Sequence, residues 1–594
     1  MNQTRKEMQM QIYLKEKIGN PDLFIGRKKE LAKYLRWIGD IKKEISSSMA
    51  ILSRRKTGKT ALLQRLYNLT FHKNDGVIPF YYEVREGKKW AIDFCKDFYL
   101  TFIYQYIAFK TRKPEYLAVS EADKSDFSKA IEIVRKEGLD YLEDSLRGIE
   151  SEIRRESPDY LWMLVREAPL NLATRRNEFI IQIIDEFQFL NSEIYRDRET
   201  ILRIDDFAAG YLSTAEYKNA PLLVSGSWVG WLMHDLTMML PGRFILDELE
   251  NMPADEAAET IFRYSQLFGI PVTEETAYMI AELSEGNPFY ISSLFKSQCP
   301  DKDLSAEEGL LHILEFETLD KRGIIRNTWM EYVNSAFSKV NEKYAKHIVL
   351  YLSRHRDRQV TRKELRDRLV PDMDDDKLEK KLKALAKSDI INQGQTNFDY
   401  QGVRDNIFDK VFRGVYQKEI EAFDVKEITR EYRQMLGEYK KRYWKLLGKL
   451  SQVKGAYAEF LIINQLRYKT RQSNARFRSA TENLPHDFQF AEYESVWCYH
   501  AFPLHKRELK IDIFARAGEN EYSVIAEVKN RERNRFSKSE AVKFLKKTEE
   551  LKEIEQVEKA VNFVFSLNGF TKGAVDFFKK HGIAWSNDDC WLGE

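Results

Sequence analysis

The 594-residue sequence is poor in the features that mark secreted and membrane-spanning proteins. Its four cysteines, Cys95, Cys299, Cys498 and Cys590, lie far apart and form no Cys-x-x-Cys pair. This spacing argues against a structural zinc site and gives no disulfide framework. No apolar run approaches the roughly 18 residues needed to cross a bilayer, and residues 1–23 contain no apolar signal core. We therefore expect a cytoplasmic protein without a membrane segment.

Neither sign of charge dominates the chain. Its 95 Lys and Arg residues nearly cancel its 93 Asp and Glu residues, so overall charge does not indicate nucleic-acid binding, and any such surface must be local. The chain is 43% hydrophobic and 32% charged, which is typical of globular domains. A sequence of this length exceeds what one hydrophobic core supports, so we expect several domains.

The patterning predicts an α/β multidomain fold. Short apolar runs alternate with helical stretches over residues 21–250, which is typical of a parallel sheet buried on both faces. The expected strands are Met49–Leu52, Ile78–Glu83, Phe179–Ile184 and Leu222–Ser225, with a helical insert at about 86–175. The other predicted parts are an N-terminal helical segment (1–20), a helical lid (251–340), a winged helix (341–415), a helical linker (416–450) and a second α/β domain (451–594).

A phosphate-binding loop is predicted between the first strand and the following helix. Residues 51–60 are ILSRRKTGKT, in which Gly58 would let the backbone approach phosphate. Lys59 would reach the β- and γ-phosphates, and the Thr60 hydroxyl would ligate Mg²⁺. The residues expected to contact nucleotide are Arg55, Lys56, Thr57, Gly58, Lys59 and Thr60. Ser53 stands where this type of loop usually begins with glycine.

A second acidic element follows the apolar strand FIIQII. Asp185 would hold the Mg²⁺ shell, and Glu186 would orient the hydrolytic water. Taken alone, the pair could equally be an acidic turn after a buried strand. Its occurrence downstream of a TGKT loop favours a nucleotide site that binds and hydrolyses ATP.

Several segments resemble the archaeal-type P-loop ATPase family, which is similar to STAND and Orc/Cdc6-like proteins. FIGRKKEL (24–31), RRKTGKT (54–60) and SEGNPFYISSL (284–294) carry the resemblance. LLVSGS (222–227) resembles the strand with the family's sensor residue, which implies a γ-phosphate contact from Ser225 or Ser227. PGR (241–243) resembles its Gly-Arg element, so Arg243 is either a phosphate or partner contact or a surface arginine.

Two carboxylates and a lysine define a second candidate site near the C-terminus. KIDIFAR and YSVIAEVK are predicted strands joined by the turn AGENE, which would bring Asp512 beside Glu527. Two carboxylates at one sheet edge suit Mg²⁺. Glu527 and Lys529 share a strand face, so Lys529 would lie within reach of the same phosphate. A solvent-facing hairpin with a salt bridge is the alternative, but both acids belong to apolar strands.

This pattern resembles the PD-(D/E)XK nuclease superfamily, which implies a restriction-endonuclease-like α/β fold and Mg²⁺, or Mn²⁺, as the cofactor. In that superfamily a glutamate often comes from the preceding helix, and Glu459 in GAYAEFLIINQL holds that position. The proline that usually precedes the aspartate is replaced by Ile511. The resemblance therefore makes Asp512, Glu527 and Lys529 catalytic, with Glu459, Asp512 and Glu527 as metal ligands.

Two basic regions are candidates for contact with DNA. KNRERNRFSK (529–538) would either grip the DNA backbone or form a solvated loop. The residues expected at the backbone are Arg531, Arg533, Arg535 and Lys543. The predicted winged helix would either bind DNA or serve only as a packing module.

The leading hypothesis is an ATPase that gates a metal-dependent deoxyribonuclease, acting in defence against foreign DNA or in mobile-element biology. The alternative is a STAND-like switch that binds nucleotide and uses its C-terminal domain only to bind nucleic acid or protein. A DNA-translocating motor ranks last, because no helicase motifs are present. The expected partners are DNA and either a second copy of the chain or another protein. The sequence does not distinguish DNA from RNA.

Overall fold

The computed structural model describes residues 12–119, 126–226, 236, 240–339, 344–394, 396, 398–501, 508–531 and 533–593. The chain divides into two compact units, Met1–Tyr439 and Lys440–Glu594. Ser227, one of the two predicted sensor residues, lies outside the described residues. No helix in the described ranges is long and apolar enough to cross a membrane.

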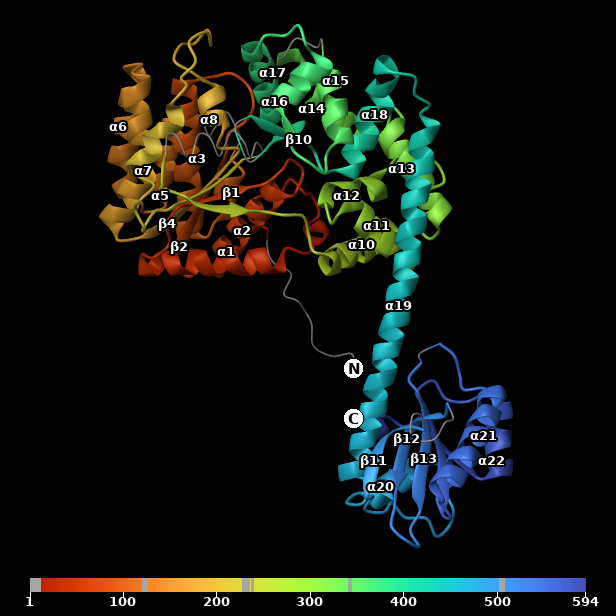
Figure 1. The fold of residues 1–594 in the computed structure, drawn as a ribbon. Helices are drawn as coiled ribbons and strands as arrows, with labels where there is room; N and C mark the ends of the chain where they lie inside the picture. Colours follow the sequence, from red (N-terminus) through yellow and green to blue (C-terminus); the bar gives the residue numbers. More distant parts are fainter. Residues whose placement is uncertain are drawn as a thin grey trace. The chain divides into compact units, whose positions relative to one another are not determined.

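The first unit is built on a parallel five-stranded sheet in the order β2-β4-β6-β1-β7 (Figure 1). Its strands are β1 (Met49–Leu52), β2 (Val77–Glu83), β4 (Phe179–Asp185), β6 (Leu222–Gly226) and β7 (Ile245–Glu248). The first four match the predicted strands, because each is an apolar run buried on both faces. The strand β7 was not predicted, because it is an edge strand whose side chains are mostly exposed.

Helices cover this sheet and fill the predicted insert. The helices α1 (Lys28–Asp40) and α2 (Lys59–Lys73) come first in the chain. The insert contains α3 (Ala91–Thr111), α5 (Phe127–Lys136), α6 (Glu143–Arg154) and α7 (Pro158–Arg176), and it is followed by the short α8 (Phe189–Ser192). A two-stranded ribbon pairs β3 (Lys89–Trp90) with β5 (Ile194–Tyr195). Buried aromatic side chains of α3, among them Phe94, Phe98 and Phe102, join it to the sheet core.

The predicted N-terminal helix is wrong where residues 12–20 are described, because this segment is not helical. Its backbone N–H groups bond to side chains of α2 instead. Tyr13 and Leu14 both donate to Asn68 Oδ1, at 3.0 and 2.8 Å, and Lys17 donates to Gln64 Oε1 at 2.8 Å. Buried Glu16 also pairs with Arg65 at 2.8 Å. Side-chain amides thus satisfy the donors that a helix would have paired internally.

Helices follow the sheet, as expected for residues 251–340. They are α10 (Ala254–Phe268), α11 (Glu274–Ser284), α12 (Pro288–Lys296), α13 (Glu307–Leu319) and α14 (Ile324–Lys339). The next segment contains α15 (Ala345–Arg354), β8 (Val360–Thr361), α16 (Arg362–Leu369), α17 (Asp375–Lys387), β9 (Ile391–Gln393), β10 (Asp399–Gly402) and α18 (Asn406–Ile420). Its strands form an antiparallel sheet in the order β8-β10-β9. This is the element order expected of a winged helix, which stays a prediction.

The predicted boundary at residue 450 falls inside one continuous helix, α19 (Lys426–Tyr468). The compact units instead divide between Tyr439 and Lys440. The polar stretch at 416–450 was predicted to be helical, and it is helical except for a short break between α18 and α19. The sequence contains no proline in α19 that would mark an end.

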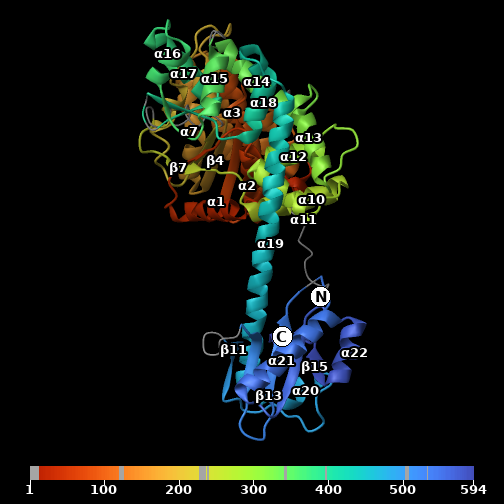
Figure 2. The ribbon, with the colours of Figure 1, turned by 45° about the vertical axis from the view of Figure 1, so that its right-hand side comes forward.

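The second unit is a mixed five-stranded sheet in the order β11-β12-β13-β14-β15. Its strands are β11 (Ser495–His500), β12 (Lys510–Arg516), β13 (Ser523–Lys529), β14 (Ala560–Ser566) and β15 (Ile583–Ser586). The first three pair antiparallel and the last three pair parallel. The remaining helices are α20 (Asn474–Ser479), α21 (Lys538–Glu555) and α22 (Lys572–His581), and α21 and α22 lie side by side (Figure 2).

Candidate active sites

The loop between β1 and α2 has the tight form that a phosphate-binding loop requires. Lys56 and Gly58 both have positive φ, 65° and 91°. At Gly58 a Cβ atom would meet only an ordinary contact, 3.5 Å from Pro288, so the left-handed backbone is what favours glycine there. The hydroxyls of Ser53 and Thr57 lie 2.6 Å apart and close the loop on itself. Ser53 therefore makes a side-chain bond where the usual glycine has none.

Arg27, from the FIGRKKEL segment, supports this loop from beneath. Its buried guanidinium donates to the backbone oxygens of Thr57 at 2.8 Å and Glu250 at 2.6 Å. This charge-assisted contact joins the loop to the segment that leads into α10. The FIGRKKEL segment thus helps to hold the phosphate-binding loop in place.

Lys59 is the first residue of α2 and is buried beneath the loop. Its ammonium donates to the backbone oxygens of Ser53 at 3.2 Å and Arg54 at 3.4 Å. Burial lowers the pKa of Lys59, and the carboxylates of Glu186 and Asp185 oppose that shift. Burial has removed water from this ammonium, and the negative charge of a nearby phosphate group would stabilise its charged form.

Asp185 joins three elements at the carboxyl ends of parallel strands. The Thr60 hydroxyl donates to its Oδ2 at 2.7 Å, and the Ser225 hydroxyl from β6 donates to its Oδ1. The carboxyl ends of neighbouring parallel strands meet at one edge of a sheet, which is where ligands of such sheets bind. Hydroxyl and carboxylate oxygens are ligands that Mg²⁺ accepts. Thr60, Asp185 and Ser225, each predicted to contact nucleotide or Mg²⁺, therefore lie together.

Glu186 lies beside this group in a strained conformation. Its φ of 54° is unusual for a residue other than glycine. The Gln188 side chain donates to the Glu186 carboxylate. Strained backbone of this kind persists only where the surrounding structure imposes it, and it clusters at functional sites. Glu186 therefore lies at the wall of the cleft beside the phosphate-binding loop, with its carboxylate held by Gln188.

These residues line a cleft of about 670 Å³ in the first unit. The predicted residues at its wall are Arg55, Lys56, Gly58, Lys59, Thr60 and Glu186. Thr57, Asp185 and Ser225 are buried behind the wall. The sequence did not reveal two aromatic residues at the cleft: Arg55 lies 4.3 Å from the ring of Tyr332, and Lys56 lies 5.5 Å from that of Phe289. These rings come from α14 and α12, so no local pattern links them to the loop.

Asp389, between α17 and β9, is a further charged group that the sequence did not single out. Burial raises its pKa to about 6, while the neighbouring cations Arg54, Arg55 and Lys59 act in the opposite direction. The segment between α17 and β9 thus brings a carboxyl group close to the charges of the phosphate-binding loop.

We expect Asp389→Asn to stabilise the protein in a pH-dependent way and to tighten nucleotide binding. The raised pKa means that the folded state holds this proton more tightly than the unfolded chain, so stability is lost as pH rises from 3.8 through about 6. The variant lacks this loss, so its stability gain over wild type should widen across that range and stay constant above pH 7. Thermal unfolding from pH 4.5 to 8 measures the gain, and titration with labelled ATP measures affinity. Asp357→Asn, which alters an exposed carboxylate in the same segment, should change neither.

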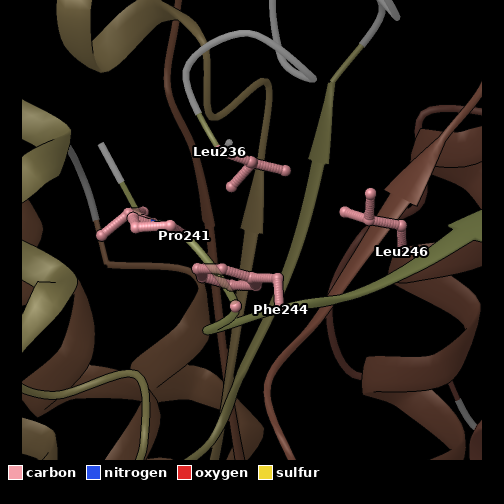
Figure 3. A pocket seen from close by; sticks show the side chains of 6 residues that line it. Leu236, Pro241, Phe244 and Leu246 are labelled. Carbon is pink, nitrogen blue, oxygen red and sulfur yellow. The ribbon is translucent and has the colours of Figure 1, made fainter. Parts of the chain in front are cut away.

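The structure does not bring Arg243 to this cleft. Arg243 precedes β7, whose first residue pairs with Met49 at the amino end of β1, whereas the phosphate-binding loop follows the carboxyl end of β1. Its guanidinium pairs with Glu216 at 3.0 Å. Beside it, Leu236, Pro241, Phe244 and Leu246 line a small apolar pocket of about 150 Å³ (Figure 3). A contact from Arg243 to nucleotide within the same chain is therefore not supported.

In the second unit, the pairing of β11 with β12 is irregular beside Asp512. Trp497 pairs with Phe514 and Tyr499 pairs with Ile511, so β11 advances by two residues where β12 advances by three. Irregularities of this kind are common beside active sites. The buried Asp512 carboxylate accepts a hydrogen bond from the backbone N–H of Val528 at 2.9 Å. The acid from β12 is thereby fixed against the end of β13.

Lys529 lies among oxygen atoms at this strand end. Its ammonium is 2.7 Å from Glu527 Oε1, 3.3 Å from Asp512 Oδ2 and 3.2 Å from the backbone oxygen of Val528. Burial alone would lower the pKa of Lys529, but the charges of Glu527 and Asp512 outweigh it and raise the pKa. The ammonium therefore stands among hard oxygen donors of the kind that a divalent cation takes.

The second carboxylate oxygen of Glu527, Oε2, also suits a site for a divalent cation. Glu527 Oε2 is buried and has no hydrogen-bond partner among the described residues. A buried carboxylate oxygen without a partner is costly, and a bound cation would satisfy it. Across the described ranges no group of three or more His, Cys, Asp and Glu side chains is by itself placed to hold a metal. A metal at either site would thus also need backbone, phosphate or water oxygens.

Glu459, on α19, lies near Asp512, and its role as a metal ligand stays a prediction. Burial and the charge of Asp512 raise its pKa. Cys498 on β11 donates to Glu459 Oε2 at 3.6 Å, and Lys510 lies close enough to lower the pKa of both groups. Cys498 and Lys510 carry no motif that would have identified them. Lys510 lies two residues before Asp512 on the strand, so only the fold shows its proximity to Glu459.

The predicted DNA-contact residues differ in their surroundings. Arg531 forms an ion pair with Glu540, at the first turn of α21. Arg533, Arg535 and Lys543 are exposed. Three of the four cations are therefore presented at the surface, whereas Arg531 helps to join the loop to α21.

Comparisons with known proteins give distant likenesses. A scan against models of protein families finds no match, and neither does a search of curated proteins. A Walker-type ATPase of Pyrococcus abyssi is 15% identical, with 68% of this chain and 100% of that one covered and a TM-score of 0.42. An ORC2 protein of Aeropyrum pernix, solved as ADPNP–ADP complexes, is 12% identical over 68% and 99%, with a TM-score of 0.37. The RuvB Holliday junction branch migration motor of Thermotoga maritima is 12% identical over 70% and 99%, with a TM-score of 0.29. Likenesses this low carry no argument about function, which must come from the sites themselves.

Proposed function

We propose that this protein binds and hydrolyses ATP in its first unit and cleaves DNA phosphodiester bonds in its second, with ATP controlling the cleavage. The observation that carries the nuclease proposal is the surroundings of Lys529. Its ammonium contacts Asp512, Glu527 and a backbone oxygen, while Glu527 Oε2 is buried without a partner among the described residues.

In the first unit, each residue has a role that follows from its position. Lys59 holds the negative charge of the terminal phosphates, and Arg55 and Lys56 hold further charge at the cleft wall. Thr60 and Asp185 hold the Mg²⁺ that accompanies ATP. Glu186 orients water for attack once Gln188 releases its carboxylate. Ser225 keeps the Asp185 carboxylate in place.

In the second unit, Asp512, Glu527 and Glu459 would hold a divalent cation, Mg²⁺ or Mn²⁺, with the backbone oxygen of Val528 and oxygens of phosphate or water supplying the ligands that the three side chains alone do not. Such a cation supplies polarisation of the phosphate and a lowered pKa for bound water. Lys529 then moves from the carboxylates to the phosphate, where it stabilises the charge that develops on the phosphate oxygens. Exposed Arg533, Arg535 and Lys543 bind the DNA backbone.

A nucleotide-dependent switch without cleavage is the second candidate. The bond between the Ser53 and Thr57 hydroxyls stiffens the phosphate-binding loop, and Gln188 holds Glu186. Both features favour slow turnover of a bound nucleotide, as suits a switch that binds a partner in one nucleotide state.

Cleavage of supercoiled plasmid and single-stranded DNA by the full chain distinguishes these proposals. We expect cleavage with Mg²⁺ or Mn²⁺, a change in its rate on addition of ATP, and none after chelation of the metal. RNA of the same length tests the choice of nucleic acid. Absence of cleavage with either metal, both with and without ATP, would leave the switch as the function of this protein.

A further inference from the structure

The helix α19 carries an apolar face that is separate from the one it packs on its own sheet. Ala458, Ile462 and Leu466 of this helix are buried in the core of the second unit. Seven other large apolar side chains on it are 48–66% exposed: Trp444, Leu446, Leu450, Val453, Tyr457, Phe460 and Tyr468. Five of these, all except Trp444 and Tyr468, lie together on one face over residues 446–460. At 3.6 residues per turn, the mean direction of these five lies about 160° from that of the buried three. The helix therefore has two apolar sides, one of which is exposed.

These five exposed residues follow a strict repeat, which Trp444 and Tyr468 do not share. With the half-buried Tyr443, the positions are 443, 446, 450, 453, 457 and 460, so that steps of three and four residues alternate without interruption. We name these six residues the α19 seam. An average step of 3.5 residues, rather than 3.6, is the repeat by which one long helix packs along another. An exposed seam of this regularity indicates a helical partner rather than a flat surface.

The partner of the seam must itself be a long helix with the same repeat. Among the helices bounded in the described residues, the one next longest after α19 is α3, whose apolar side chains are already buried in the first unit. A second copy of α19 has the required length and repeat. Self-pairing of one face around a two-fold axis is also the commonest way in which protein chains associate.

Charge at the edges of the seam decides between parallel and antiparallel pairing. Residues 440–458 contain six Lys and Arg residues and no Asp or Glu. In a parallel pair, Lys449 would face Lys454 of the other copy at two symmetric places, which is unfavourable. Lys449 and Lys454 lie on opposite edges of the seam. In an antiparallel pair centred between residues 451 and 452, each edge lies along the same edge of the other copy, so that Lys449 lies beside Ala456 and Lys454 lies beside Leu447. The lysine stems then cover apolar side chains while their ammonium groups remain in water.

The same antiparallel register also matches the seam residue by residue. Tyr443 meets Phe460 of the other copy, Leu446 meets Tyr457, and Leu450 meets Val453, so every seam position faces another seam position. Aromatic residues lie toward both ends and aliphatic residues at the centre. We infer that two copies of this protein associate through an antiparallel pairing of their α19 seams. This inference does not depend on the proposed catalytic function.

Sedimentation of the full chain tests the association. We expect a species of twice the 70.2 kDa chain mass. Replacement of the central pair by Leu450→Glu with Val453→Glu should return it to a monomer, because four buried carboxylates would face one another. Both positions are half exposed or more, so the fold of the single chain should be kept, which circular dichroism checks. Gln452→Glu, exposed beside the seam, should remain a dimer. A wild-type monomer at every concentration would overturn the inference.

Cysteine cross-linking tests the orientation, with Cys498→Ser in every sample because Cys498 is the one cysteine of the described chain that is not buried. An antiparallel pair should give disulfide-linked dimers when Leu450→Cys and Val453→Cys chains are mixed, and few when either is oxidised alone. Efficient linking of Leu450→Cys chains to one another would show a parallel pair and overturn the arrangement. Protection of the seam cysteines from alkylation in a monomer would mean that the chain's own residues cover the seam.

Salt distinguishes self-pairing from capture of an anionic partner by the six basic residues. Screening of these charges should strengthen association of two copies as salt rises. Binding of DNA or of anionic lipid vesicles along the same helix would weaken instead. If the seam variant lost vesicle or DNA binding while wild-type mass stayed that of a monomer, the seam would serve such a partner and self-pairing would be excluded.

Discussion

Glu527→Gln should reduce metal-dependent DNA cleavage by about 100-fold or more while leaving ATP hydrolysis unchanged. The substitution keeps the shape of the side chain but removes the charge that faces Lys529 at 2.7 Å. It also leaves one neutral amide oxygen in place of two carboxylate oxygens, one of which is buried without a partner among the described residues, and its NH₂ group cannot ligate a cation. Loss of a metal ligand removes several kcal/mol of stabilisation of the developing charge, which corresponds to a rate loss of roughly this size.

A binding measurement separates this explanation from a folding defect. Mn²⁺ should raise the unfolding temperature of the wild-type second unit, and Glu527→Gln should abolish that rise while its unfolding temperature without metal stays at or above that of wild type. Glu519→Gln, in the exposed turn of the same hairpin, should behave as wild type in both assays. If Glu527→Gln kept both cleavage and the Mn²⁺ response, the centre around Lys529 would be a structural ion-pair cluster.

Much of the fold could be predicted because the core strands are buried on both faces. A run such as FIIQII has few alternatives when it must be shielded from water on two sides. The same logic placed Thr60 near Asp185, since the carboxyl ends of parallel strands share one edge. The strand β7 escaped prediction because an exposed edge strand, ILDE, has no such run. The boundary near 450 was misplaced because α19 continues through it.

The candidate sites were predictable where their residues share one local element and not where packing over long distances joins them. Glu527 and Lys529 lie two residues apart on one strand, so their common face follows from the sequence. Asp512 lies one step beyond Ile513, which pairs with Ala526, so its position beside Glu527 follows from the hairpin between β12 and β13. Asp389 and Tyr332 reach the phosphate-binding loop from some 270 to 330 residues downstream, and no local pattern connects them to it.

Lys59→Met is expected to abolish ATP hydrolysis and to weaken ATP binding by at least about tenfold. Among the described residues, the buried ammonium donates hydrogen bonds only to backbone oxygens of the loop, at 3.2 and 3.4 Å, so its charge is available to phosphate. A charge-assisted contact contributes roughly 1.5–3 kcal/mol, which corresponds to tenfold or more in affinity. Methionine has a similar length and no charge to bury, so the first unit should keep its stability without nucleotide.

The control for this variant is Lys73→Ala, which alters an exposed lysine at the other end of α2 and should hydrolyse ATP normally. The comparison also tests coupling between the two units. If ATP controls cleavage through its own site, Lys59→Met should retain metal-dependent cleavage at the rate seen without nucleotide, and added ATP should no longer change it. Cleavage that still responds to ATP would place the responding site elsewhere. Normal hydrolysis by Lys59→Met would mean that the loop after β1 does not hold the reacting phosphate, because Lys59 is the buried ammonium of that loop near Asp185 and Glu186.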